Sequence, residues 1–180
     1  MECDPDCAIP YAMPTTPTLL IIWHSRTGAA EAMAQVAEQA AADAAAGECA
    51  VVLRRAGEAQ ADELLAAHGY LFVCPENLAS MTGAMKEFFD RSYYPLLGQI
   101  EGRPYAAMVA AGSDGQGAVR QIERIATGWR LKRIADSLII CTHAQTPEAI
   151  AAPKLLGEAD LALCRDLGAT FSAGLAMGIF

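Results

Sequence analysis

The sequence lacks an apolar run long enough to cross a bilayer, although 53% of its 180 residues are hydrophobic. A membrane-spanning helix needs roughly 20 consecutive apolar residues, whereas strand-like runs such as residues 18–23 and 105–111 have only six or seven. The basic start of a secretory signal peptide is also missing, because the first charged residues are Glu2, Asp4 and Asp6. These absences predict a soluble cytoplasmic protein without a membrane partner.

Basic residues are scarce. The chain has 13 lysines and arginines against 21 aspartates and glutamates, which gives a net charge of −8. Binding to nucleic acid needs a basic surface that neutralises phosphates. The charge balance therefore argues against a nucleic-acid partner.

Metal-ligand and disulfide patterns are lacking as well. The six cysteines form no CxxC pair, and the three histidines, at positions 24, 68 and 143, have no metal-ligand spacing. Cys74 and Cys141 lie in apolar runs, which favours buried free thiols in a reducing compartment. We predict no metal site in the body of the chain.

The first sixteen residues differ from the rest. They contain prolines without hydrophobic periodicity, so we predict a disordered leader over residues 1–16 and one domain over residues 17–180. Cys3 and Cys7 leave a metal site in the leader open as an alternative, but a mobile tail is the interpretation that we favour.

Five short apolar runs alternate with segments of helical spacing. The runs are continuously apolar, as in strands covered on both faces, and cover residues 18–23, 49–54, 70–74, 105–111 and 137–142. One predicted helix begins after Gly28, and four more cover residues 62–67, 83–96, 117–126 and 161–175. This alternation predicts an α/β fold with a parallel sheet between two layers of helices. Ligands of such sheets bind at the carboxyl ends of the strands.

The loop after the first strand reads HSRTGAAE over residues 24–31. Hydroxyls and a glycine at a strand-to-helix turn suit a phosphate, because the backbone amides at the start of a helix are free. The loop lacks the lysine of the GxxxxGK[ST] motif that binds nucleoside triphosphates. It also lacks the GxGxxG pattern of dinucleotide-binding sites. The alternative is an ordinary helix cap by Ser25 or Thr27.

The loops after the third and fourth strands are also unusual. Leu78 and Met81 are apolar residues in an otherwise polar loop, where a flat, partly apolar ligand would cover them. Residues 112–117 contain three glycines, which let backbone amides approach a ligand closely. The alternatives are an ordinary surface loop after the third strand and a merely flexible loop over residues 112–117. Three such loops at one edge of a sheet favour a ligand site.

Together these loops resemble those of the flavodoxin-like family, specifically its NAD(P)H-dependent FMN reductase and quinone reductase branch. The resemblance covers about residues 17–145, and its most specific element is the run PENLASMTGAMKEFFDR over residues 75–91. It implies a three-layer α/β/α sandwich whose five-stranded parallel sheet has the order 2-1-3-4-5.

The resemblance also implies an FMN site. The residues expected to hold the 5′-phosphate are Ser25, Arg26, Thr27, Gly28, Ala29 and Ala30. Those expected to line the ring and its N5 edge are Pro75, Glu76, Asn77, Leu78, Ala79 and Ser80. Those expected to donate amides to the ring carbonyls are Gly112, Ser113, Asp114, Gly115, Gln116 and Gly117.

The chain departs from the family pattern in two places. Ala30 stands where flavodoxins often carry a further threonine, and the charge of Arg26 could compensate. The second loop has Asn77 and Leu78 in place of an aromatic residue, so one face of the ring is open or covered by Leu78 alone.

The resemblance implies an oxidoreductase that passes hydride from NAD(P)H through FMN to a quinone or similar acceptor. The flavin would carry the chemistry, so no catalytic side chain is expected. A one-electron carrier of the flavodoxin type and a non-catalytic flavin-binding module are the alternatives. Part of the aromatic set of Phe88, Phe89, Tyr93 and Tyr94 is expected to form the contact face of a homodimer or higher homo-oligomer.

Overall fold

The computed structural model describes residues 16–180, so the expected leader, with Cys3 and Cys7, lies outside the described residues apart from Thr16. Four parallel strands form the middle of the sheet in the order β2-β1-β3-β5. Their bounds are β1 Thr18–Trp23, β2 Ala50–Arg55, β3 Gly69–Asn77 and β5 Pro104–Ala111. The predicted sheet order is confirmed, because the last predicted strand, β7 (Leu138–Cys141), pairs in parallel with β5.

Two short strands were not predicted. β6 (Lys132–Arg133) pairs with the start of β5, so β6 and β7 share its outer edge. β4 (Ser80–Met81) runs antiparallel to the end of β3. Both strands have two residues, and a segment of this length carries no hydrophobic period from which it could be predicted.

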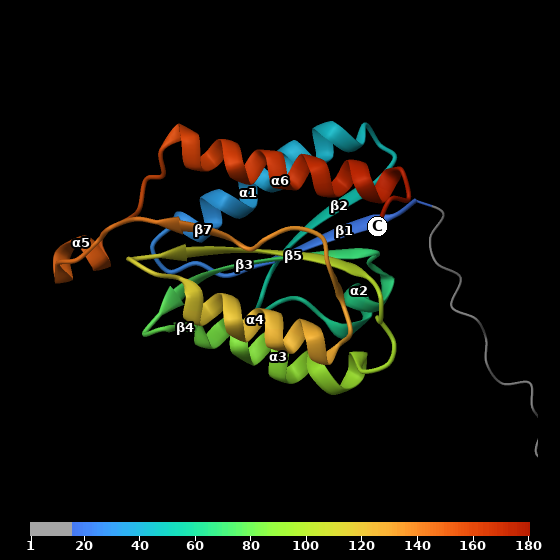
Figure 1. Cartoon of the computed structure of the whole chain (residues 1–180), viewed down its shortest axis with the longest axis horizontal. Coiled ribbons are helices and arrows are strands. Elements are labelled where there is room, and N and C mark those ends of the chain that lie inside the picture. The colour runs from blue at the N-terminus through green and yellow to red at the C-terminus, as the bar shows by residue number, and fades with distance from the viewer. Residues whose placement is uncertain (1–15) are drawn as a thin grey trace, which may run out of the picture.

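Helices cover both faces of the sheet (Figure 1). On one face lie α1 Ala29–Ala45 and α6 Glu158–Ala176, and on the other lie α2 Ala61–Ala66, α3 Gly83–Leu96 and α4 Gln116–Gly128. All five correspond to predicted helices. The short helix α5 (Pro147–Ala151) lies apart from both layers and was not predicted.

The two faces of the sheet are packed with different residues. Phe72 on β3 contacts Phe88 and Phe89 of α3, and Phe89 contacts Trp129 just after α4. The face toward α1 is instead rich in small residues, and α1 buries seven residues of which six are alanines: Ala29, Ala30, Met33, Ala34, Ala37, Ala41 and Ala45. Small side chains let α1 and α6 approach each other closely.

The predicted aromatic set is divided between core and surface. Phe88 and Phe89 are fully buried, whereas the Tyr94 side chain is 81% exposed. Tyr93 is half-buried and stacks on Trp129. Of the four rings, only those of the tyrosines are therefore accessible to a partner.

The four cysteines among the described residues, Cys49, Cys74, Cys141 and Cys164, are free. Of the two that were predicted to be buried, Cys74 is buried, whereas Cys141 is half-buried. Within residues 16–180 no helix is both long and apolar enough to span a bilayer.

The close contact between α1 and α6 depends on Gly168. A Cβ atom at this position would lie 2.3 Å from the Ala37 carbonyl oxygen, so Gly168→Ala must push the two helices apart. We expect a loss of about 2 kcal/mol in the free energy of unfolding, measured by urea denaturation.

The matched control is Gly83→Ala at the first residue of α3, where an added Cβ has nothing within 4 Å. That variant should be neutral or stabilised by up to about 1 kcal/mol, because alanine favours helix. Equal stability of the two variants would contradict the packing argument.

Candidate functional site

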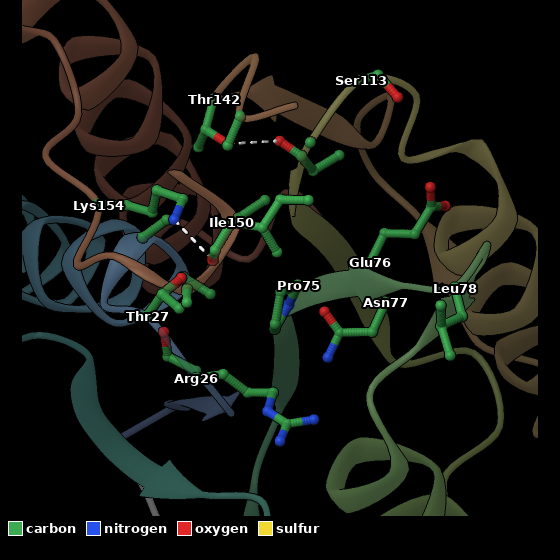
Figure 2. A pocket seen from close by; sticks show the side chains of 18 of the residues that line it. Arg26, Thr27, Pro75, Glu76, Asn77, Leu78, Ser113, Thr142, Ile150 and Lys154 are labelled. Carbon is green, nitrogen blue, oxygen red and sulfur yellow. Dashed lines mark hydrogen bonds between the residues drawn. The ribbon is translucent and has the colours of Figure 1, made fainter. Parts of the chain in front are cut away.

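A cleft of about 770 Å³ opens at the carboxyl ends of β1, β3, β5 and β7. Small-molecule sites usually have volumes of roughly 300–1,000 Å³. The first and second predicted loops contribute Ser25, Arg26, Thr27, Ala29, Ala30, Pro75, Glu76, Asn77, Leu78 and Ala79 to its lining. The third loop contributes only Gly112 and Ser113. The cleft thus brings all three predicted loops together (Figure 2).

The first loop turns sharply into α1. Gly28 has φ 93°, a left-handed conformation that glycine adopts without strain. Its amide donates to Ser25 Oγ at 3.1 Å. Gly28 itself does not line the cleft, so its part is to direct the turn that brings Ser25, Arg26 and Thr27 to the cleft wall.

The second loop is a tight β-hairpin. Glu76 pairs with Met81 and Asn77 with Ser80, which leaves Leu78 and Ala79 as the turn. Both turn residues have positive φ, 52° and 57°, as a type I′ turn requires. Figure 2 shows the Asn77 side chain directed from β3 toward the cleft and Leu78 farther out at the tip, where Leu78 is fully exposed.

Glu76 connects the second loop with the third. Its carboxylate accepts hydrogen bonds from the amides of Gly115 at 3.0 Å and Ala118 at 2.9 Å, at the start of α4. From α4, Gln121 Oε1 accepts from Ser80 Oγ and from the Met81 amide, both at 3.0 Å. The hairpin is therefore fixed to α4 from both sides.

The glycines of the third loop serve this packing. The Gly115 amide is bonded to Glu76, and a Cβ at Gly117 would lie 2.1 Å from the Ala79 carbonyl oxygen. Asp114, Gly115, Gln116 and Gly117 do not line the cleft, and neither does Ser80. Their expected contact with a ligand stays a prediction.

Sequence reasoning did not single out five of the lining residues, all from the segment between β7 and α6. They are Thr142, Ala144, Ile150, Ala151 and Lys154. Ala110 and Ala111 at the end of β5 also line the cleft. The Thr146-Pro147 pair that begins α5 is a helix-start signal that could have located the segment.

The charged residues of the lining are Arg26, Glu76 and Lys154. Within residues 16–180 no carboxylate forms an ion pair with Arg26 or Lys154. The Glu76 charge is taken up by the amides of α4. The cleft thus offers two uncompensated positive charges, which suit an anionic group such as a phosphate.

Titratable groups near the cleft are held in neutral forms. Burial, followed by the charges of Arg26 and Arg55, lowers the pKa of His24, so this imidazole is neutral at pH 7. Burial raises the pKa of Cys74 to about 12, and its thiol is therefore not a nucleophile. Neither side chain lines the cleft.

Comparison with protein families and curated proteins gives two matches. A family model described as NADPH-dependent FMN reductase matches residues 33–144. The flavodoxin of Aquifex aeolicus (strain VF5) is 31% identical over 99 residues, which are 55% of this chain and 52% of that protein. The chain thus spans about half the length of this curated relative.

Solved structures confirm the flavodoxin-like fold. An archaeal flavodoxin has a TM-score of 0.69 at 16% identity and covers 88% of this chain and 98% of its own. A flavodoxin, WrbA-like protein from Agrobacterium tumefaciens has a TM-score of 0.68 at 17% identity, and the match covers 91% of this chain and 99% of that one. An oxidoreductase from Corynebacterium diphtheriae has a TM-score of 0.65 at 17% identity, and the match covers 91% of this chain and 97% of that one.

The hairpin turn at Leu78 and Ala79 predicts a stabilising substitution. Left-handed backbone costs an L-residue about 1–2 kcal/mol, whereas glycine adopts it freely. Ala79→Gly should therefore raise the free energy of unfolding by about 0.5–1 kcal/mol in urea denaturation without ligand.

The control is the same change at exposed Ala42 in the last turn of α1. Ala42→Gly should destabilise the protein by about 0.5–1 kcal/mol, because glycine weakens a helix. A loss of stability in both variants would refute the proposed strain at Ala79.

Proposed function

Since this chain belongs to the NADPH-dependent FMN reductase family, we propose that it is an FMN-containing oxidoreductase. It would take reducing equivalents from NAD(P)H and pass them to a quinone or similar small-molecule acceptor. The observation that carries the proposal is the pair of uncompensated cations, Arg26 and Lys154, at a strand-edge cleft with an otherwise mostly uncharged lining.

The residues of the cleft fit FMN. Ser25, Arg26 and Thr27 would hold the phosphate, with charge from Arg26 in place of the hydroxyl that Ala30 does not supply. Pro75 and Asn77 would lie along the ring, and the amides of Gly112 and Ser113 would face its polar edge. FMN, when bound, supplies the electron-transfer chemistry.

The protein's part would be to bind and orient the reactants. Among residues 16–180, no histidine, cysteine or aspartate lines the cleft, and the one carboxylate of the lining, on Glu76, is engaged with α4. The described lining therefore offers no free carboxylate, imidazole or thiol as a general acid or base. This fits a reaction in which the cofactor carries the chemistry.

The lining also supports a reductase over an electron carrier. None of the described residues that line the cleft is aromatic, so no ring would cover the flavin. An open flavin face gives NAD(P)H and the acceptor access in turn. One-electron carriers of the flavodoxin type usually enclose the ring between aromatic side chains.

The carrier is nevertheless the second candidate. The similarity to the Aquifex flavodoxin favours it, and the net charge of −8 would suit docking to a basic protein. The two candidates differ in their response to NADPH, because a carrier receives electrons from a partner protein.

We also propose that the protein is a homodimer in the cytoplasm. Tyr94 and Leu78 are large, exposed apolar residues near opposite ends of α3, and a second copy would cover such side chains. Four free cysteines among the described residues suit a reducing compartment. Size-exclusion chromatography at two concentrations would test the dimer.

The decisive experiment uses the purified protein loaded with FMN under anaerobic conditions. Addition of NADPH should bleach the flavin absorbance directly to the two-electron reduced form, and a quinone should restore the colour. In Arg26→Ala, FMN affinity should fall by about tenfold, as for one lost charge-assisted contact.

The control is Lys132→Ala, which removes an exposed charge at the amino end of β5, opposite the cleft. It should leave FMN binding and bleaching unchanged. A flavin that binds but ignores NADPH, and that accumulates a one-electron reduced form on stepwise reduction, would favour the carrier. Failure to bind any flavin would refute both candidates.

A further inference from the structure

Large apolar side chains are scarce in the lining of the cleft. Among the described lining residues, those that are apolar and larger than alanine are Pro75, Leu78 and Ile150. Leu78 lies at the tip of the hairpin, where it is fully exposed. Figure 2 shows Ile150 between Lys154 and Pro75, with Leu78 beyond Asn77. A ligand inside the cleft therefore has Pro75 and Ile150 as its large apolar neighbours.

Ile150 belongs to α5, a helix that is held mainly from within its own segment. α5 has five residues and buries none of them, and a helix of this length is far too short to be stable alone. Thr146 Oγ1 caps its start by accepting from the Ala149 amide at 3.2 Å. The Lys154 ammonium donates to the carbonyl oxygens of Ala149, Ile150 and Ala152 at 2.6, 3.0 and 2.6 Å. These bonds shape α5 but do not attach it to the sheet.

Two anchors attach the segment between β7 and α6 to the rest of the fold. At its start, the Thr142 amide and hydroxyl donate to the Ala111 carbonyl oxygen at 2.8 and 3.2 Å. Near its end, the Lys154 amide donates to the Thr27 carbonyl oxygen at 2.7 Å. Across residues 16–180, and apart from those to Lys154, no hydrogen bond joins residues 143–153 to residues outside this stretch. Side-chain packing must therefore decide where α5 lies.

The Ile150 side chain has area available for such packing. It is 56% exposed although it lines the cleft. Leu155, in the same segment, is 98% exposed and does not belong to the lining. Burial of apolar area is favourable in proportion to the area removed from water. An apolar ligand against Ile150 therefore gains affinity and holds α5 at the same time, whereas Leu155 offers a ligand in the cleft nothing.

We propose that Ile150 packs against the flavin ring in this protein, and that this contact holds α5 at the cleft. The inference rests on the proposed function and adds a ring contact from outside the three loops that the sequence singled out. No aromatic side chain among the described residues lines the cleft, so an aliphatic side chain takes this part. The contact involves the ring and not the phosphate, and FMN and riboflavin therefore share it.

The first test measures the affinities of FMN and riboflavin for the full chain by isothermal titration calorimetry. Ile150→Ala should lower both affinities by about tenfold, because the apolar contact is lost. Alanine is the best helix former, so this change does not weaken α5 itself. Ile150→Leu should keep most of both affinities. The matched control is Leu155→Ala, which should change neither.

Nuclear magnetic resonance tests the contact directly. In protein labelled at the δ1 methyl groups of isoleucine, the Ile150 signal is the one that disappears in Ile150→Leu. In the complex with FMN, this methyl group should show a nuclear Overhauser effect to protons of the flavin ring, which requires direct proximity. A residue with a merely structural role in α5 would show none.

Hydrogen exchange tests the second half of the proposal. The amides of Ile150 and Ala152 donate within α5 to the carbonyl oxygens of Thr146 and Glu148 at 2.8 and 2.9 Å, so their exchange reports the opening of this helix. Saturating FMN should slow this exchange by at least about fivefold in the unchanged protein and in Leu155→Ala. In Ile150→Ala, FMN at saturation should slow it far less.

Three results would overturn the inference. The first is an unchanged affinity for riboflavin in Ile150→Ala. The second is the absence of any Overhauser effect between Ile150 and the ring of bound FMN. The third is an exchange rate in α5 that does not respond to FMN in the unchanged protein. Failure of the unchanged protein to bind any flavin would instead refute the proposed function itself.

Discussion

The carboxylate of Glu76 accepts hydrogen bonds from two amides at the start of α4, and the arrangement of the cleft follows from this contact. A carboxylate at a helix N-terminus is favoured by the helix dipole as well as by the bonds themselves. The bonds join the hairpin after β3 to the loop after β5, so two walls of the cleft form one unit. They also engage amides of α4 that would otherwise attract a ligand anion. The anion-attracting end of the cleft is thereby left to the first loop and to the segment between β7 and α6.

That end depends on the packing between α1 and α6. Both helices follow strands of the parallel sheet and begin at its carboxyl edge, α1 after the first loop and α6 after the segment that follows β7. The contact of Gly168 with the Ala37 backbone lets the two helices lie close together. Their starting segments are consequently neighbours, and the bond from Lys154 to Thr27 can form. The packing of this alanine-rich face thus contributes to the site, and Ala29 and Ala30 at the start of α1 also line the cleft.

The sequence allows the regular part of this structure to be predicted and leaves out the parts that only tertiary contacts define. Buried strands are continuously apolar, so the runs at residues 18–23 and 105–111 located β1 and β5 closely. The segment between β7 and α6 has no such pattern, because α5 buries no side chain and the Lys154 ammonium is held by carbonyl oxygens alone. The resemblance placed Glu76 beside a ligand, but no sequence pattern indicates that its carboxylate binds α4. β4 likewise exists only because the hairpin folds back on β3.

The distribution of charge in the cleft limits the kind of ligand more strongly than its shape does. Arg26, which is exposed, and Lys154, which is half-buried, place two positive charges at one end of the cleft, whereas Pro75, Ala110 and Ile150 make much of the remaining wall apolar. A ligand that complements both regions has an anionic terminus and a flat or apolar body. Because the described lining offers no free carboxylate, imidazole or thiol, we infer that the reactivity comes with that ligand, as it does in FMN.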